Sequence, residues 1–479
     1  MSPAVTAPHY PIAVVGGGIA GLTLALALER QGVNYILFDA HESLSPDEGA
    51  SIGLLPNGLR ILDQLGLLGE IEKHTLPLQR WRHMDGEGNL LCESNALGYY
   101  PSKLGYGGMF LPRRKVLEIM ANSLKSHETV RTGTRVLSLE ETDDNVAISL
   151  SNGSHITADL VIGADGVRSS VREAIDRTHP GPPTHADDYM KARFACVYGI
   201  SPPVKGIVEG ECFSIYRPGA TILIFTGQGA TIFWFVFEDL GREYGLSSTP
   251  RYTRDDIDAV CRSVAHLSIT PAVSFGGVYA TRSVAVKVSL EEGIAPIWHT
   301  GRVVIVGDAA HKVSEEKLID QVTATAKPVQ STPNAAMGAN QAIESSTVLL
   351  NELRGVWSRS PQHGLFPPTA LRAALERYSE LRMLRASTVV QRAGMICRAQ
   401  LGHDGPAAFT REELPSLMDW DWLFRGFTSF ADSPALAGLP LSSKGEFYQD
   451  AVERFQKRVR ARQTGAESIS IAALFGMEP

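Results

Sequence analysis

Apolar runs and polar turns alternate at the start of the chain and predict a β-α-β unit. Residues 11–15 form an apolar run that enters a glycine-rich turn, and residues 22–30 are rich in alanine and leucine, as in a buried helix. A second apolar run at residues 35–38 ends at Asp39. Strand, helix and strand thus follow one another within about 30 residues, the arrangement that a dinucleotide-binding turn requires.

Later apolar runs extend this unit and then change in character. Residues 135–139 and 145–150 alternate between apolar and polar positions around a polar turn, which predicts two paired strands. An apolar run at 160–162 is followed by a turn and indicates a further strand of the same sheet. From about residue 190 to 288 short strands dominate, with glycine and proline at their turns, and we expect a second sheet that covers a substrate.

The rest of the chain is mainly helical. Residues 303–306 form one more buried strand, helical character runs from 335 to 353, and the chain after residue 368 is largely helical to 462. The composition, 44% hydrophobic and 20% charged, is ordinary for an enzyme of two or three packed domains. The fold class predicted is α/β (α+β), with a Rossmann-like domain, an inserted, mostly antiparallel β-sheet domain and a helical C-terminal region.

Charge and cysteine usage exclude several classes of protein. The net charge is −7 and no Lys/Arg run occurs, so no nucleic acid is expected as a partner. The five cysteines lie far apart without a CxxC pair, so neither a metal site nor a disulfide framework is predicted. No signal peptide and no apolar window of about 18 residues occur, so no transmembrane span is expected. The expected location is the cytoplasm, with peripheral membrane contact left open.

The glycine-rich turn carries the first candidate chemistry. Gly16 permits a tight bend, Gly18 lets the backbone approach a pyrophosphate, and Gly21 lets helix and strand pack closely. The N-terminus of the following helix presents free N–H groups to the phosphates. Asp39 lies 23 residues after Gly16, where a carboxylate can hydrogen-bond the ribose hydroxyls of an adenosine. Together these features predict that the chain binds a dinucleotide.

Two later motifs follow apolar strands: Asp165-Gly166, and Gly307-Asp308 with Ala309-Ala310-His311 after it. With the glycine turn in front, this order resembles that of class A flavoprotein monooxygenases, the para-hydroxybenzoate hydroxylase-like group. The resemblance covers about residues 11–353 and implies FAD as the cofactor. It implies that Asp308 binds a ribityl hydroxyl, and that Asp165 and Gly166 serve the pyrophosphate region and NAD(P)H. A helix cap or a turn would also favour aspartate at either place.

This resemblance sets the expected domain organisation. Residues 8–189 and 291–355 would form the two parts of the FAD-binding domain, residues 190–290 the β-sheet domain over the substrate, and residues 356–479 the helical C-terminal region. Arg114 matches the arginine that the family places near the flavin and pyrophosphate, and its neighbour Arg113 is the alternative match.

A narrower resemblance lies in the stretch Ser51-Ile52-Gly53-Leu54-Leu55-Pro56-Asn57-Gly58. It is similar to fungal FAD-dependent monooxygenases of meroterpenoid and indole-diterpene pathways, many of which epoxidise an alkene of a prenyl chain. The resemblance implies that Gly53 lies against the flavin. It also implies an active-site arginine and tyrosine on the central sheet, for which Arg193 and Tyr216 are the best matches, with Tyr216 a candidate proton donor. An exposed arginine and an ordinary strand tyrosine are the alternative interpretation.

Other candidates are assigned to packing. His311 belongs to the expected flavin-binding turn and is interpreted as structural rather than as a base. The aromatic group of the C-terminal region could contact lipid or a lipidic substrate, but buried helix packing is favoured. Its members are Trp420, Trp422, Phe424, Phe427 and Phe430.

One segment departs from the family pattern. Eighteen residues, 313–330, separate Lys312 from Ser331, where the family passes quickly to the helix that contacts the flavin. Removing them restores the family spacing and brings Ala339 to an FAD-contacting position. Val-Ser can be encoded by GTAAGT and Gln by CAG, the usual ends of an intron, and 18 codons make 54 nucleotides. We therefore interpret residues 313–330 as a retained intron, with a genuine surface loop as the alternative.

The function expected from the resemblance is that of a single-component monooxygenase. NAD(P)H would reduce FAD, and the reduced flavin with O₂ would form a C4a-hydroperoxide that passes one oxygen to a small lipophilic substrate. Epoxidation of a prenyl or terpenoid alkene is the leading reaction. Hydroxylation of an aromatic ring is the first alternative, and a flavin-deficient polypeptide produced by the retained intron is the second.

Overall fold

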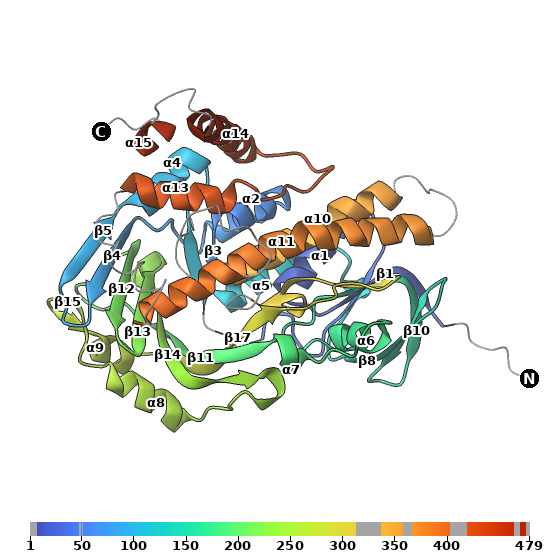
Figure 1. Cartoon of the computed structure of the whole chain (residues 1–479), viewed down its shortest axis with the longest axis horizontal. Helices are drawn as coiled ribbons and strands as arrows, with labels where there is room; N and C mark the ends of the chain where they lie inside the picture. Colours follow the sequence, from blue (N-terminus) through green and yellow to red (C-terminus); the bar gives the residue numbers. More distant parts are fainter. Residues whose placement is uncertain are drawn as a thin grey trace, which may run out of the picture.

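The computed structural model describes residues 7–46, 49, 51–312, 337–357, 366–402, 419–463 and 470–475. Figure 1 shows two sheets beside each other, with long helices running across both and a group of C-terminal helices above them. The segment 313–330, interpreted above as a retained intron, lies outside the described residues.

The first sheet, called here the nucleotide sheet, contains the predicted β-α-β unit. Its strands follow the order β7-β2-β1-β10-β9-β8, and β18 pairs with β10. The pairs β1–β2, β1–β10, β2–β7 and β10–β18 are parallel, whereas β8, β9 and β10 pair antiparallel. Its strands are β1 (His9–Val15), β2 (Ile36–Phe38), β7 (Val130–Arg131), β8 (Val136–Glu141), β9 (Val146–Leu150), β10 (His155–Gly163) and β18 (Val303–Ile305).

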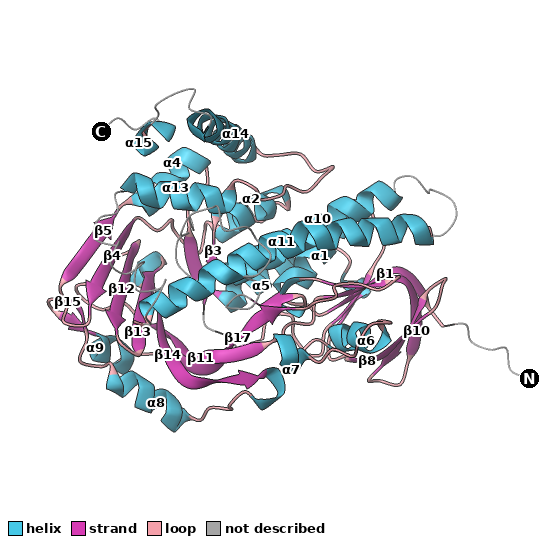
Figure 2. Ribbon diagram, viewed as in Figure 1, coloured by secondary structure: helices cyan, strands magenta, loops and turns pink. Residues whose placement is uncertain are grey.

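The second sheet, called here the large sheet, has the order β19-β17-β11-β14-β13-β12-β4-β5 in the described residues (Figure 2). The sequence placed its strands between residues 190 and 288. Two further strands, β4 and β5, join it from the N-terminal part of the chain, and β4 pairs in parallel with β12. Its strands are β4 (Arg80–Asp85), β5 (Leu90–Ser94), β11 (Lys191–Ser201), β12 (Glu211–Arg217), β13 (Ala220–Thr226), β14 (Ile232–Gly245), β17 (Val284–Ile294) and β19 (His311–Lys312).

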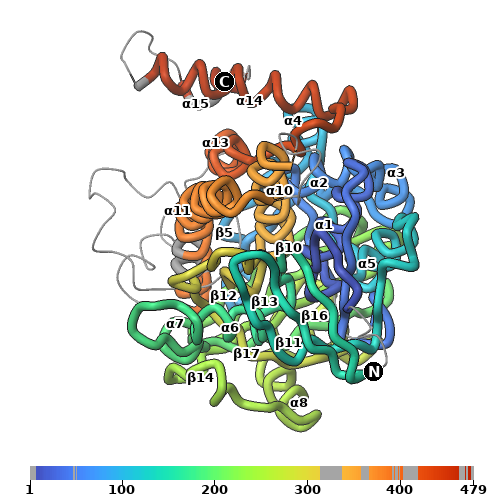
Figure 3. Tube along the Cα trace, turned by 90° about the vertical axis from the view of Figure 1, so that its right-hand side faces the viewer, coloured from blue at the N-terminus to red at the C-terminus, as the bar shows by residue number. Residues whose placement is uncertain are grey.

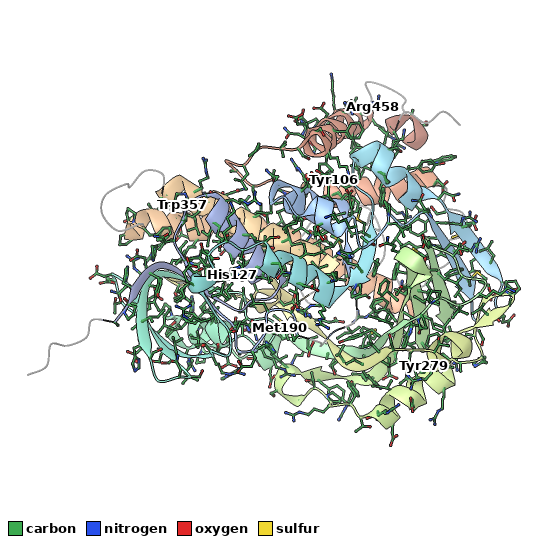
Figure 4. The ribbon with its side chains drawn as sticks, turned by 180° about the vertical axis from the view of Figure 1, so that it is seen from behind. Tyr106, His127, Met190, Tyr279, Trp357 and Arg458 are labelled. Carbon is green, nitrogen blue, oxygen red and sulfur yellow. The ribbon has the colours of Figure 1, made fainter. Side chains whose placement is uncertain are left out.

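Both faces of the large sheet carry apolar side chains, and both are covered by other parts of the protein. On the outer face Ile222, Trp234 and Val236 pack against the helices α8 (Arg254–Ser263) and α9 (Phe275–Ala280). On the inner face Phe225 and Phe237 belong to the core shared with the nucleotide sheet. Figure 4 labels Tyr279, from α9, in the outer layer and Tyr106 near the C-terminal helices on the other side of the molecule.

Two long helices pack against each other, and the second of them reaches the large sheet. Helix α10 (Met337–Trp357) packs against α1 (Ile19–Arg30), α2 (Pro56–Gln64) and α11 (Pro368–Gln400). The far end of α11 reaches the inner face of the large sheet, where Thr221 donates a hydrogen bond of 2.5 Å to the carbonyl of Gln400. The remaining elements are β3 (Ser51–Leu54), β6 (Met109–Pro112), β15 (Ser268–Thr270), β16 (Val273–Ser274), α3 (Leu68–Ile71), α4 (Ala96–Leu104), α5 (Arg113–Asn122), α6 (Ser170–Thr178) and α7 (Ala186–Tyr189).

The C-terminal helices α13 (Asp419–Phe430), α14 (Ser443–Gln463) and α15 (Ile471–Leu474) lie on the side of the molecule that carries α4 (Figure 3). Rings of Phe427, Phe455 and Phe475 contact one another with centroids 4.9–5.4 Å apart. Trp422 and Phe430 are buried. Buried packing, the interpretation favoured from the sequence, is therefore what the structure shows for these rings.

Candidate active site

The glycine turn has the backbone geometry that its sequence requires. Gly16 has a φ of +103°, and a Cβ built there would lie 2.4 Å from the carbonyl oxygen of Ala164. A Cβ on Gly21 would lie 1.8 Å from the carbonyl oxygen of Gly16, so α1 can pack against the turn only with glycine at that position. A Cβ on Gly18 would meet no atom within 4 Å. Two glycines therefore serve the fold, whereas Gly18 faces open space.

The open space belongs to a cavity of about 370 Å³ that runs from the turn to Asp39 and Arg113. The Asp39 carboxylate accepts hydrogen bonds from the backbone N–H of Gly17 at 2.6 Å and of His41 at 2.8 Å. These bonds fix one carboxylate at the end of β2, beside the N-terminus of α1. The N–H donors of a helix N-terminus suit a pyrophosphate and a carboxylate acceptor suits the ribose hydroxyls, so the residues fit the adenosine half of FAD.

Of the two arginines that the sequence left open, only Arg113 is among the residues that line this cavity. Its side chain is half-buried, lies close to Gly49, and its charge acts on Asp308. Arg114, the next residue on α5, is exposed. We therefore assign the cofactor-facing role to Arg113 as a proposal.

Replacing Arg113 by alanine should raise the Kd for FAD by about ten- to a hundredfold, because a charge-assisted contact is worth about 1.5–3 kcal/mol. The matched variant Arg114→Ala should change this Kd by less than about twofold. Titrating the apoprotein with FAD and following flavin fluorescence measures both constants. If Arg114→Ala loses more FAD affinity than Arg113→Ala, then Arg114 is the residue that contacts FAD.

The Asp165-Gly166 turn is held by helix α6. The Asp165 carboxylate accepts hydrogen bonds from the Ser169 hydroxyl at 2.5 Å and from the backbone N–H of Ser170 at 2.8 Å. Burial raises the pKa of this carboxyl despite these bonds. Gly166 has a φ of +79° and, like Asp165, lines the cavity. The Asp165 carboxylate thus accepts hydrogen bonds from N–H groups at the start of α6. Its expected contact with the cofactor or with NAD(P)H stays a prediction.

The Gly307-Asp308 turn follows β18 and lies beside α10. Asp308 forms an ion pair with Lys312. Burial alone would raise the pKa of Asp308, but the Lys312 charge outweighs it and the net shift is downward. Asp308 is therefore a carboxylate at neutral pH and can accept a hydrogen bond from a hydroxyl. Binding of a ribityl hydroxyl by Asp308 remains the expectation from the sequence.

Gly53 and Ala339 are brought together through a residue that sequence reasoning did not single out. Asn340, one position after Ala339 on α10, donates to the carbonyl of Gly53 at 3.0 Å and accepts from the N–H of Leu55 at 3.1 Å. A Cβ on Gly58 would lie 2.1 Å from the Asn340 oxygen. The buried asparagine therefore ties the first turn of α10 to β3.

Beneath this junction lies a buried ionic network, also absent from the sequence analysis. Glu344 is fully buried and binds Arg385 through both carboxylate oxygens, at 2.6 and 2.7 Å. Arg382 contacts the same carboxylate at 2.9 Å, and Asn57 donates to it at 2.7 Å. Burial alone would raise the pKa of Glu344, but the two arginines lower it to about 2.

His311 is attached to this network and has a structural position. Its Nε2 lies 2.7 Å from the Ser345 hydroxyl, to which Arg382 also donates at 3.1 Å. Burial, with the Arg382 charge, lowers the pKa of His311 to about 3, so the imidazole is neutral. A buried, neutral His311 agrees with its interpretation as a structural residue.

Arg193 and Tyr216 lie on the same sheet but apart. Their strands β11 and β12 are separated by β14 and β13, a lateral distance of roughly 14 Å. Arg193, at a bulge of β11, pairs with Asp239 at 3.1 Å. The phenol of Tyr216 is buried and lies 2.6 Å from Nδ1 of His83. Each of the two candidates is therefore held by its own partner, and they do not form one contact pair.

Comparison with known proteins agrees with this geometry. The protein family described as FAD binding domain matches residues 9–316. The FAD-dependent monooxygenase atmM of Aspergillus flavus is 33% identical over 445 residues, covering 91% of this chain and 88% of that protein. The FAD-dependent monooxygenase paxM of Penicillium paxilli is 32% identical over 403 residues, covering 82% and 79%.

Solved structures show the same fold at low identity. Klebsiella pneumoniae HpxO in complex with FAD and uric acid has a TM-score of 0.67 at 20% identity, covering 88% of this chain and 97% of that one. A salicylate hydroxylase substrate complex has a TM-score of 0.62 at 22% identity, covering 90% and 100%. The chain therefore belongs to the FAD-binding-domain family of flavoproteins.

Within that family the protein is an FAD-dependent monooxygenase. The resemblance to class A flavoprotein monooxygenases and to their fungal members is thereby confirmed, as are the fold class and FAD as cofactor. In the described part of the chain, no helix combines the length and apolar character needed to cross a membrane.

Proposed function

We propose that this monooxygenase consumes NAD(P)H and O₂ and epoxidises an alkene in the prenyl or terpenoid part of a small lipophilic molecule, in a fungal pathway of secondary metabolism. Alkene, O₂, NAD(P)H and one proton would give epoxide, NAD(P)⁺ and water. Bound FAD supplies the activation of O₂ and the transfer of one oxygen atom. The chain must bind the cofactor, exclude water and position the alkene.

The observation that carries the proposal is a continuous series of aromatic rings next to the expected flavin position. Phe110 is the strand partner of Gly53 and stacks on Phe225 with centroids 4.0 Å apart. Phe225 contacts Trp81 at 5.5 Å, and Trp81 stacks on His83 at 5.5 Å. These buried rings give the interior between Gly53 and Tyr216 an apolar character, which supports an apolar substrate there.

The names of the relatives support the monooxygenase part of this proposal. The proteins atmM and paxM are called FAD-dependent monooxygenases and come from fungi. Arg193 and Tyr216 lie on the sheet that would cover the substrate, and we propose that they position it. Because Arg193 is paired with the Asp239 carboxylate, we propose that it offers the substrate a hydrogen bond rather than a free charge.

The proposal is tested by incubating the FAD-loaded enzyme with prenylated aromatic substrates, NADPH or NADH, and ¹⁸O₂. We expect one labelled oxygen on the prenyl alkene, found by mass spectrometry and located by NMR. Label on the aromatic ring would favour the hydroxylase alternative. NAD(P)H oxidation that gives only hydrogen peroxide with every alkene tested would contradict the proposal.

The origin of residues 313–330 has its own test, which is independent of the substrate. Sequencing cDNA across the codons of Lys312 and Ser331 shows whether the 54 nucleotides remain in the mature transcript. Transcripts that uniformly carry them would end the intron hypothesis. Comparing FAD content in the full chain and in a chain without residues 313–330 then shows what the segment does to the cofactor.

A further inference from the structure

Tyr216, proposed above to position the substrate, sits in an arrangement of rings that determines where its proton points. The inference below rests on the proposed function. On the inner face of the large sheet, Trp81 and His83 of β4 lie diagonally across from Ser214 and Tyr216 of β12. Nε1 of Trp81 donates to the Ser214 hydroxyl at 2.9 Å, and Nδ1 of His83 lies 2.6 Å from the Tyr216 phenol.

The Trp81 donor fixes the direction of the first of these two hydrogen bonds, and the burial of Tyr216 bears on the second. The indole N–H of Trp81 can only donate, so the Ser214 oxygen accepts and its own proton is free to be donated. Burial raises the pKa of the Tyr216 phenol, so this group keeps its proton at neutral pH and needs an acceptor for it. Among the contacts of the described residues, Nδ1 of His83 is the acceptor within reach of that proton.

His83 can accept that proton, and the packing around its ring holds the ring in place. Its ring stacks on Trp81 at a centroid distance of 5.5 Å and on Trp422 of α13 at 5.1 Å, and each indole plane lies within 11° of the imidazole plane. The side chain is 2% exposed, and burial lowers its pKa to about 3. A neutral imidazole carries one N–H, so Nδ1 can accept when the proton is on Nε2, which is buried and has no hydrogen-bond partner among the described residues.

We propose that His83 is a positioning residue for Tyr216: its Nδ1 accepts the phenol proton, so Tyr216 meets the substrate with a lone pair of its oxygen instead of its proton. This revises the expectation that Tyr216 donates a proton. It also suits an epoxide product, because epoxides open to diols when an acid protonates the oxygen. A phenol that donates its proton to His83 cannot readily protonate the epoxide oxygen.

Histidine ¹⁵N NMR of the FAD-loaded enzyme tests the hydrogen bond without any substrate. The His83 signals are those lost in His83→Phe. We expect a protonated Nε2 and an unprotonated, hydrogen-bonded Nδ1, unchanged across neutral pH. In Tyr216→Phe the Nδ1 signal should move to the position of a free, unprotonated nitrogen. A proton found on Nδ1 would overturn the proposal.

Product analysis tests the consequence. His83→Phe keeps a stacked ring but frees the phenol proton, so the ratio of diol to epoxide should rise about tenfold with little change in KM. His83→Asn places an amide near the Nδ1 position and should restore the ratio. His83→Phe combined with Tyr216→Phe should match Tyr216→Phe alone. If the wild-type enzyme forms no epoxide, the proposed function fails, while the NMR result still decides the direction of the hydrogen bond.

A diol fraction in His83→Phe equal to that of the wild-type enzyme would contradict the consequence for the product. Two results together would show that His83 has only a packing role. The yield of folded protein would fall equally in His83→Phe and His83→Asn, and the Nδ1 signal of His83 would not change in Tyr216→Phe. In that case the assignment of His83 to Tyr216 is wrong.

Discussion

Gly18→Val is expected to purify as a folded protein without the yellow colour of bound FAD. A Cβ at this position meets no protein atom within 4 Å, and Gly18 has an extended backbone conformation with a φ of −75° that valine also adopts. The added side chain would instead occupy the space in front of the α1 N-terminus. The Kd for FAD should rise at least about 100-fold, a loss of about 2.7 kcal/mol of binding free energy.

The measurement combines FAD titration with thermal unfolding of the apoprotein. The apoprotein of Gly18→Val should unfold within a few degrees of the wild-type apoprotein, because no internal contact changes. Gly21→Ala serves as the contrasting variant, since its Cβ would lie 1.8 Å from the carbonyl oxygen of Gly16 and should destabilise the fold itself. Retention of FAD by Gly18→Val would show that the pyrophosphate does not lie at this turn.

The second large effect is expected from Glu344→Ala. Removing the carboxylate leaves Arg382, 1% exposed, and Arg385 without their shared buried partner. Loss of one partner of a buried ionic network costs about 3–5 kcal/mol in the free energy of unfolding. Urea denaturation of the apoprotein measures this loss. The matched control is Glu352→Ala on the same helix, whose pair with the half-exposed Arg377 should contribute less than about 1 kcal/mol.

The same carboxylate predicts how acid acts on the protein. Because the pKa of Glu344 falls from 4.5 to about 2 on folding, its contribution to stability is fully present above pH 4.5. It is lost as the pH falls through the range between these two values. Glu344→Gln should therefore remove part of the decline in stability between pH 4.5 and 2, and an unchanged decline would show that other groups cause it.

Local sequence patterns predicted those parts of the protein that are formed by neighbouring residues. The turn at Gly16 and the strand that ends just before Asp39 depend on spacing within one β-α-β unit, and the strand that enters Gly307 is marked by its own short apolar run; the structure has all three. Residues 35–38 were predicted as a strand because a short apolar run bounded by turns is typical of a buried strand.

The parts that were missed depend on contacts between distant residues. Nothing in the sequence near Glu344 shows that Asn57 and Arg385 meet it, because those contacts join three helices. His83 lies on a strand that joins the large sheet from far upstream, so its contact with Tyr216 spans 133 positions. The only local signal was its position in a strand with Trp81 two residues earlier, on the same face.

Helix α11 joins the flavin-binding core to the sheet proposed to cover the substrate. At 33 residues it is about 50 Å long. In its first half Tyr378 donates to the carbonyl of Ile305 at 2.9 Å, directly before the turn that carries Asp308, and at its end Gln400 accepts from Thr221. A continuous helix is stiff along its axis. The core and the covering sheet are therefore coupled mechanically, and a displacement of the Asp308 turn along this axis would be transmitted to the strand beside Tyr216.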